Sequence, residues 1–171
     1  MKKKELLINI IMTLIMSDFM GLLASVFVFL SPKTETPSLP ILMLSNVAES
    51  IVVGLIVALI IPFGVIGKKI CDKAGVRPPS FKFTALNSIP YSLGNALIIS
   101  SVVSFINVYM AHSKIPKQVA PPLLTMWFSS WAPLLVPSII LGYLISILVS
   151  PYIVKMVGVP KNHEIARSEE R

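Results

Sequence analysis

The chain has few of the residues that enzymes and metal proteins depend on. Its 171 residues include one cysteine, Cys71, and two histidines, His112 and His163. A single thiol excludes an intrachain disulfide. Metal ligation needs several histidine, cysteine or carboxylate side chains that converge on one point. The sequence also has no nucleophile elbow, no His-Glu-x-x-His helix and no glycine-rich phosphate loop. We therefore expect a protein that is not an enzyme, with no metal site and no cofactor.

Charged residues are scarce too, at 13% of the chain, whereas 54% of the residues are hydrophobic and the mean hydropathy is +0.81. A soluble domain of this size could not cover so much apolar surface. Four apolar segments are each long enough to cross a hydrocarbon layer of about 30 Å at about 1.5 Å per helical residue. They lie near residues 6–30, 41–66, 85–109 and 131–156. We predict an all-α, polytopic membrane protein with a bundle of four transmembrane helices, the first of them uncleaved.

The distribution of lysine and arginine predicts how the chain is oriented. Most of the basic residues flank the spans on one side. They are Lys2, Lys3 and Lys4 before the first span, Lys68, Lys69, Lys73, Arg77 and Lys82 between the second and third, and Lys155, Lys161, Arg167 and Arg171 around the end of the fourth. Because basic segments stay on the cytoplasmic side, we expect a multi-pass protein of the cell membrane with both termini in the cytoplasm. The net charge of +7 is then a topology signal, and we expect the middle basic loop to contact anionic lipid rather than nucleic acid.

Small or weakly polar residues recur at every fourth position in each span. The stripes are Asn9, Thr13, Ser17, Gly21 and Ser25; Asn46, Ser50, Gly54 and Ala58; Thr84, Ser88, Ser92, Ala96, Ser100 and Ser104; and Ser138, Gly142, Ser146 and Ser150. Residues four apart share a helical face, and small side chains there let two helices approach closely. The residues that we predict to pack the helices in this way are Ser17, Gly21, Gly54, Ser92, Ala96 and Gly142. The alternative is that serine, glycine and alanine are simply common in membrane helices.

The stripes also indicate an internal repeat. The first and third stripes share an offset of 75 residues, and residues 50–58 match residues 138–146 at an offset of 88. We therefore predict two helical hairpins, residues 1–76 and 77–160, followed by a cytoplasmic tail at residues 161–171. Because two spans separate equivalent helices, the hairpins would form a parallel repeat about an axis along the membrane normal.

A family resemblance accompanies the repeat. The stretch Ile11–Gly21, followed by a hairpin that ends with Ala58–Pro62 and then basic residues, resembles a bacterial membrane family described as a two-helix domain of unknown function. The closing helix from Trp131 to Pro151 is similar to the same family, whereas Ser92–Asn95 departs from its pattern. The resemblance implies a tandem pair of two-helix units and no particular reaction.

Two acidic residues lie within the predicted spans. Asp18 lies about 18 Å from either end of the first span, where an unpaired carboxylate costs about 2.5 to 3.5 kcal/mol. It is a candidate for proton coupling or cation binding, or alternatively for a structural interhelical hydrogen bond, and Asn95 at a similar depth is its candidate partner. Glu49 is the second candidate, and Asn46 shares its helical face. If the second helix begins near Val47, Glu49 is instead an interfacial residue near a helix amino terminus.

Four prolines lie within two turns of a predicted span end: Pro62, Pro133, Pro137 and Pro151. At such positions a missing backbone donor favours termination or a gentle bend over a gating hinge.

Two functions from different classes remain open. One is a small secondary transporter or exporter, in an oligomer, that couples transport to a proton or cation at Asp18, with help from Glu49. The other is a non-transporting partner or regulatory subunit of a larger membrane complex, held there by the small-residue seams and the basic loop.

Overall fold

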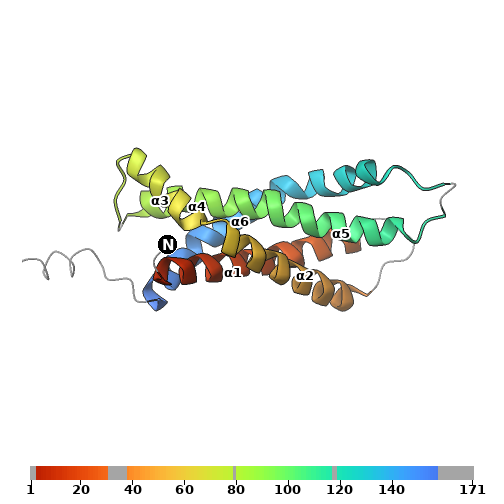
Figure 1. Ribbon diagram of the computed structural model, residues 1–171, viewed down its shortest axis with the longest axis horizontal. Helices are drawn as coiled ribbons and strands as arrows, with labels where there is room; N and C mark the ends of the chain where they lie inside the picture. Colours follow the sequence, from red (N-terminus) through yellow and green to blue (C-terminus); the bar gives the residue numbers. More distant parts are fainter. Residues whose placement is uncertain (1–2, 31–37, 79, 117–118, 158–171) are drawn as a thin grey trace, which may run out of the picture.

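The computed structural model describes residues 3–30, 38–78, 80–116 and 119–157. The helices of these ranges are α1 (Lys3–Leu30), α2 (Leu39–Ile60), α3 (Phe63–Lys73), α4 (Phe81–Gly94), the π-helical turn η1 (Asn95–Ile99), α5 (Ser100–His112) and α6 (Leu123–Met156). They form an elongated bundle, and α3 lies at the end where α1 begins (Figure 1). We call this the basic end, because it carries Lys68, Lys69 and Lys73. The opposite end, near Trp127 and Trp131, is the aromatic end.

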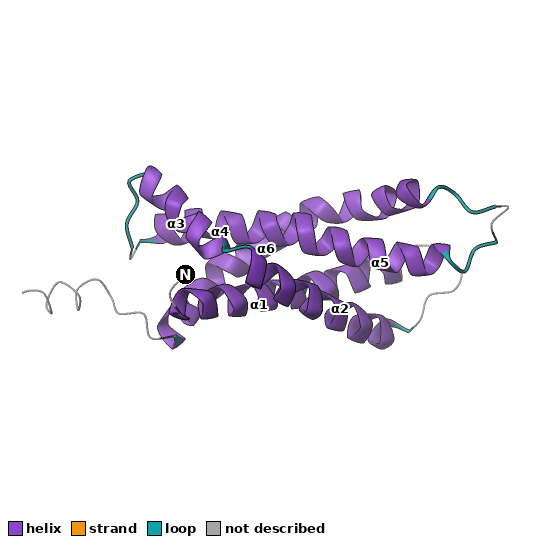
Figure 2. Cartoon of the chain, viewed as in Figure 1, coloured by secondary structure: helices purple, strands orange, loops and turns teal. Residues whose placement is uncertain are grey.

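Four helical segments are long and apolar enough to cross a membrane: α1, α2, the continuous segment Phe81–His112, and α6. Large apolar side chains such as those of Leu44, Val136 and Leu148 point outward, as lipid-facing residues do. All regular structure in the described residues is helical (Figure 2). The predicted all-α bundle of four membrane helices is therefore confirmed, and the chain is a multi-pass membrane protein. The predicted tail at residues 161–171 lies outside the described residues.

The second span is shorter than predicted. The sequence favoured one helix over residues 41–66, but α2 ends at Ile60 and a separate helix, α3, begins at Phe63. Proline has no backbone N–H, so Pro62 cannot donate to the carbonyl of Ala58 and continue the helix. The new helix is amphipathic and packs against α4 through Phe63, Gly67 and Cys71, which are buried. Hydropathy summed over the whole segment could not show this break.

The fourth span begins earlier than predicted, at Leu123 instead of residue 131. Pro133 and Pro137 therefore lie well inside α6, and the expectation that they lie within two turns of a span end is wrong. Pro151 still lies within two turns of the end of α6 at Met156. The added turns are anchored by tryptophan. The indole Nε1 of Trp127 donates to the carbonyl of Ser101 at 3.1 Å, and that of Trp131 donates to Ser100 Oγ at 3.0 Å. These bonds attach the first turns of α6 to α5.

The third span contains a π-helical turn at Asn95–Ile99, between α4 and α5. A stripe at strict four-residue spacing rotates by about 40° per step around an α-helix, so a long stripe drifts away from its neighbour. One π turn inserts a residue and rotates the following residues back. In this span Ser88, Ser92, Ala96, Ser100 and Ser104 are consequently all buried.

The closest helix contact is the seam between α1 and α2. A methyl group at Gly21 would lie 2.6 Å from Ser50 Oγ and 2.7 Å from the carbonyl oxygen of Asn46. A methyl group at Gly54 would collide with the side chain of Ser17. Close approach of the two backbones thus requires glycine at both positions, as expected where dispersion rather than the hydrophobic effect holds helices together.

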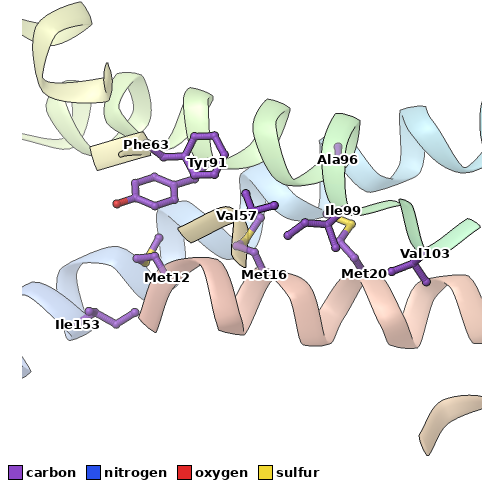
Figure 3. Packing of buried hydrophobic residues seen from close by; sticks show 10 residues of the cluster. All are labelled: Met12, Met16, Met20, Val57, Phe63, Tyr91, Ala96, Ile99, Val103 and Ile153. Atoms are coloured by element: carbon purple, nitrogen blue, oxygen red, sulfur yellow. The ribbon is translucent and has the colours of Figure 1, made fainter. Parts of the chain in front are cut away.

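A second contact joins α1, α4 and α6. A methyl group at Gly142 of α6 would lie 2.8 Å from Met16 Cε and 3.0 Å from Met20 Cε. Ser92 Oγ of α4 donates to the carbonyl oxygen of Ile139 at 2.6 Å. Around these contacts lies the apolar core, in which the three methionines of α1 line up along one face (Figure 3). The core residues are Met12, Met16, Met20, Val57, Phe63, Tyr91, Ala96, Ile99, Val103 and Ile153.

The seam predicts the effect of adding volume at Gly54. Gly54→Val should destabilise the folded bundle by about 1 to 3 kcal/mol, because the new methyl groups must displace Ser17 and separate α1 from α2. Reversible unfolding in mixed micelles measures this difference. Ala48→Val, at an exposed position of the same helix, is the control and should change stability little. Equal stability of the two variants would contradict the close packing.

Candidate functional site

Asp18 lies in the middle of the first membrane helix. It is the sixteenth of the 28 residues of α1 and is half-buried. Its Oδ1 atom is shielded from solvent and has no hydrogen-bond partner among the described residues. The neighbouring Ser17 faces α2, so Asp18 lies about 100° around the helix from that seam.

Glu49 has a similar position on the second helix. Because α2 begins at Leu39, Glu49 is the eleventh of its 22 residues, and the alternative that it lies near a helix amino terminus is wrong. Its Oε1 accepts a hydrogen bond from Ser45 Oγ at 3.3 Å. Its Oε2 is buried and no described residue pairs with it.

The two predicted amide partners bond elsewhere. Asn95 Nδ2 donates to the carbonyl of Tyr91 at 2.6 Å, and no bond joins it to Asp18 within the described ranges. Asn46 Nδ2 donates to Ser25 Oγ at 3.0 Å, while its Oδ1 accepts from Asn107 Nδ2 at 2.7 Å. Asn46 therefore ties α1, α2 and α5 together, which is a structural role. Asn107 lies outside the four-residue stripe of its span, so the spacing of small residues does not identify it as a partner of Asn46.

The residues predicted to pack helices all lie between helices. Ser17, Gly21 and Gly54 line the seam of α1 and α2, and Gly142 meets α1. Ser92 bonds α6. Ala96 is fully buried in the core cluster.

Hydrogen bonds of the Asn9 side chain, which we call the polar lock, join α1 to the break between α2 and α3. Asn9 Nδ2 of α1 donates to the carbonyl oxygens of Ala58, at 2.7 Å, and Ile61, at 3.0 Å. The backbone N–H of Gly64 donates to Asn9 Oδ1 at 3.3 Å. The amide thus replaces the donor that Pro62 lacks. Broken backbone at membrane depth is tolerated only where such partners satisfy it.

Tyr91 and Phe63 cover this break from the side of α4. Their rings lie 5.7 Å apart, and the Tyr91 hydroxyl lies where a side chain on Gly64 would be (Figure 3). The four-residue stripes do not point to this cluster. The available signals were Pro62 followed by Gly64 and Gly67, and an asparagine at the head of the first stripe.

The basic end carries exposed cations on α3 and the loop that follows it. The exposed basic side chains there are those of Lys68, Lys69 and Lys73 on α3 and of Arg77 in the loop, and Lys82 follows in the first turn of α4. Cys71 points the other way, is buried, and its Sγ donates to the carbonyl of Phe83 at 3.6 Å. Burial, and then the charge of Asp72, raise the pKa of this thiol. Cys71 therefore stays protonated and serves packing, while the opposite face of α3 presents positive charge.

Of the cavities on the described surface, we consider two, and neither of these is lined by Asp18 or Glu49. One, of about 420 Å³, lies at the aromatic end between His112 and Pro122. The other, of about 330 Å³, is an apolar groove between α4 and α6 that includes Leu93 and Tyr143.

Comparison with known proteins identifies no relative. No protein-family model, no curated protein and no solved structure matches the chain. The resemblance to a two-helix bacterial family and the tandem repeat therefore stay predictions, and function has to be argued from the geometry.

The polar lock predicts that Asn9 is important for stability. Asn9→Leu keeps the branched shape but leaves the Ala58 carbonyl and the Gly64 N–H unpaired at the break, and removes one of the two donors to the Ile61 carbonyl, which should cost about 2 to 5 kcal/mol of unfolding free energy. Unfolding in mixed micelles is again the measurement. Thr125→Val, a similar loss of polarity at an exposed site on α6, should leave stability unchanged within about 0.5 kcal/mol. If Asn9→Leu behaves like Thr125→Val, the break does not depend on this amide.

Proposed function

We propose that the chain is a small proton- or cation-coupled transporter or exporter in which Asp18 takes up and releases the coupling ion. The observation that carries this proposal is the position of Asp18, in mid-helix with an oxygen that is shielded and unpaired in the described residues. A carboxylate at such depth is expensive in lipid unless it is protonated, hydrated or bound to a cation. Each of these states is a step that a coupled transporter uses.

Glu49 supports the same proposal. Because Gly21 packs at Ser50 and Gly54 packs at Ser17, the two carboxylates lie about 6 Å apart along the bundle axis. One hairpin thus carries two ionisable groups at nearly the same depth, each with an oxygen that lacks a partner in the described residues. A proton or cation could occupy either of them in turn.

The transport path would involve more than one copy of the chain. The seams of small residues are used within the bundle, and the two cavities lie away from the carboxylates. A homo-oligomer would therefore enclose the path between copies, through lipid-facing surfaces that include the flank carrying Asp18.

The membrane setting follows from the basic end. We place the protein in the cell membrane with both termini in the cytoplasm, since basic segments are retained there. The cations of α3 then face the inner leaflet, where each basic residue near an anionic surface contributes about 1 kcal/mol to lipid binding.

The alternative function is a non-transporting partner or regulatory subunit of a larger membrane complex. The observation that favours it is the filled core, in which seven other buried side chains pack around the three methionines of α1. The other proteins of such a complex would contact this chain through surfaces other than the seams, because contacts within the bundle already fill the seams.

Proton flux distinguishes the two functions. The full chain is reconstituted into vesicles of mixed neutral and anionic lipid with an internal pH dye, and a potassium diffusion potential drives protons inward. We expect wild-type flux well above that of empty vesicles, and a loss of about tenfold or more in Asp18→Asn, which removes the titrating oxygen but keeps the shape. Glu49→Gln should show a smaller loss.

Asp72→Asn is the matched control, because Asp72 is exposed and lies outside the spans. Its flux should equal that of wild type. Wild-type vesicles no more permeable to protons than empty ones would overturn proton coupling at Asp18 and favour the membrane partner.

A further inference from the structure

Three helices are held in a fixed register near the centre of the bundle. Gly142 of α6 lies against Met16 and Met20 of α1, and Ser92 of α4 bonds α6 at Ile139. Helices α1 and α4 run away from the basic end, whereas α6 runs toward it (Figure 1). One turn toward the basic end is therefore a few residues earlier on α1 and α4, and a few residues later on α6.

At that level each of the three helices carries a buried hydroxyl. Thr13 lies three residues before Met16, Ser88 lies four before Ser92, and Ser146 lies four after Gly142. Their exposed fractions are 0%, 1% and 0%. None of the three hydroxyls has a hydrogen-bond partner among the described residues. Since residues four apart share a face, Ser88 and Ser146 lie on the faces of Ser92 and Gly142, while Thr13 lies between the directions of Met16 and Ser17 on α1. These positions turn the three side chains toward the interior of the bundle.

A fourth hydroxyl belongs to the same region. Tyr91 is 1% exposed, and its oxygen is likewise unpaired within the part of the chain that the structure describes. Its ring extends from α4 toward the basic end, beside Met12 of α1 (Figure 3). The long side chain carries its oxygen toward the basic end, where it borders Gly64 at the start of α3 as well as the region of Ser88 and Thr13.

The serines of the neighbouring seams behave differently. Ser17 donates to the carbonyl of Thr13 at 2.7 Å, Ser25 donates to that of Gly21 at 2.8 Å, and Ser100 donates to that of Ala96. A carbonyl four residues earlier can thus satisfy a hydroxyl in these helices. Thr13, Ser88 and Ser146 do not use it, so their hydroxyls remain directed at the space between the helices.

The chemistry of the four hydroxyls indicates which kind of ligand they would bind. A hydroxyl both donates and accepts hydrogen bonds, and buried hydroxyls in native proteins are almost always satisfied. None of the four carries a charge, so an ion among them would lack compensation. We propose that Thr13, Ser88, Tyr91 and Ser146 form a buried hydrated site, in which ordered water bridges α1, α4 and α6. The proposal does not depend on Asp18 or on transport.

Radiolytic labelling tests the proposal directly. A short X-ray pulse converts ordered water into hydroxyl radicals in place, and mass spectrometry locates the oxidised side chains of the full chain in nanodiscs. Although Met12 and Tyr91 are almost completely buried, we expect them to be oxidised at least about fivefold faster than Met20, which lies farther from the hydroxyls. The difference should disappear in Thr13→Val/Ser146→Ala. Ser17→Ala, which removes a hydroxyl already bonded to its own helix, should leave it unchanged.

Equal oxidation of Met12, Tyr91 and Met20 in wild type would overturn the proposal. Melting temperature gives a second measurement that does not require the double variant to fold. If water satisfies the site, Thr13→Val lowers the melting temperature, because it removes a partner of that water. If the site is dry, the same variant deletes an orphaned polar group and raises the melting temperature, which would also overturn the proposal.

Discussion

Close approach of α1 and α2 is the constraint on which the rest of the structure depends. In lipid no hydrophobic effect pulls helices together, so association relies on dispersion and interhelical hydrogen bonds. Gly54 against Ser17, and Gly21 against Ser50, supply the short separation. At that separation the Asn9 amide can donate to the carbonyl of Ala58 in α2, and the Asn46 amide can donate to Ser25 Oγ. The glycines and the amides therefore act together.

The same constraint determines where polar groups can be placed. On the seams, Asn9, Asn46 and Ser92 bond neighbouring helices, and Ser17 bonds its own helix. Asp18 and Glu49 lie beside the seams, and each keeps an unpaired oxygen in the described structure. Polarity inside the bundle is thus of two kinds. One kind, represented by Asn46 and Asn9, holds helices together and closes the break. The other kind has no structural partner, and we assign function to it.

Much of the fold follows from the sequence, because its determinants are local. The number of spans follows from the length of the apolar segments, and all the residues of the four-residue stripes except Thr84 are buried. The break at Pro62 and the π turn at Asn95–Ile99 could not be predicted in this way. Hydropathy averages over a whole helix, and the bonds of Asn9 join residues about 50 positions apart. For the same reason Asp18 could be identified by depth, but its lack of a bond to Asn95 could not.

The small-residue stripes of α1 and α2 face each other within one chain. Disulfide formation tests this arrangement, in a Cys71→Ala background with cysteines introduced at Ser25 and Asn46. In the native chain Asn46 Nδ2 lies 3.0 Å from Ser25 Oγ. Oxidation in membranes should give a rapid disulfide within the chain, and no link when the second cysteine is placed at the exposed Ala48 instead. A link between chains at positions 25 and 46, or none at all, would contradict the account.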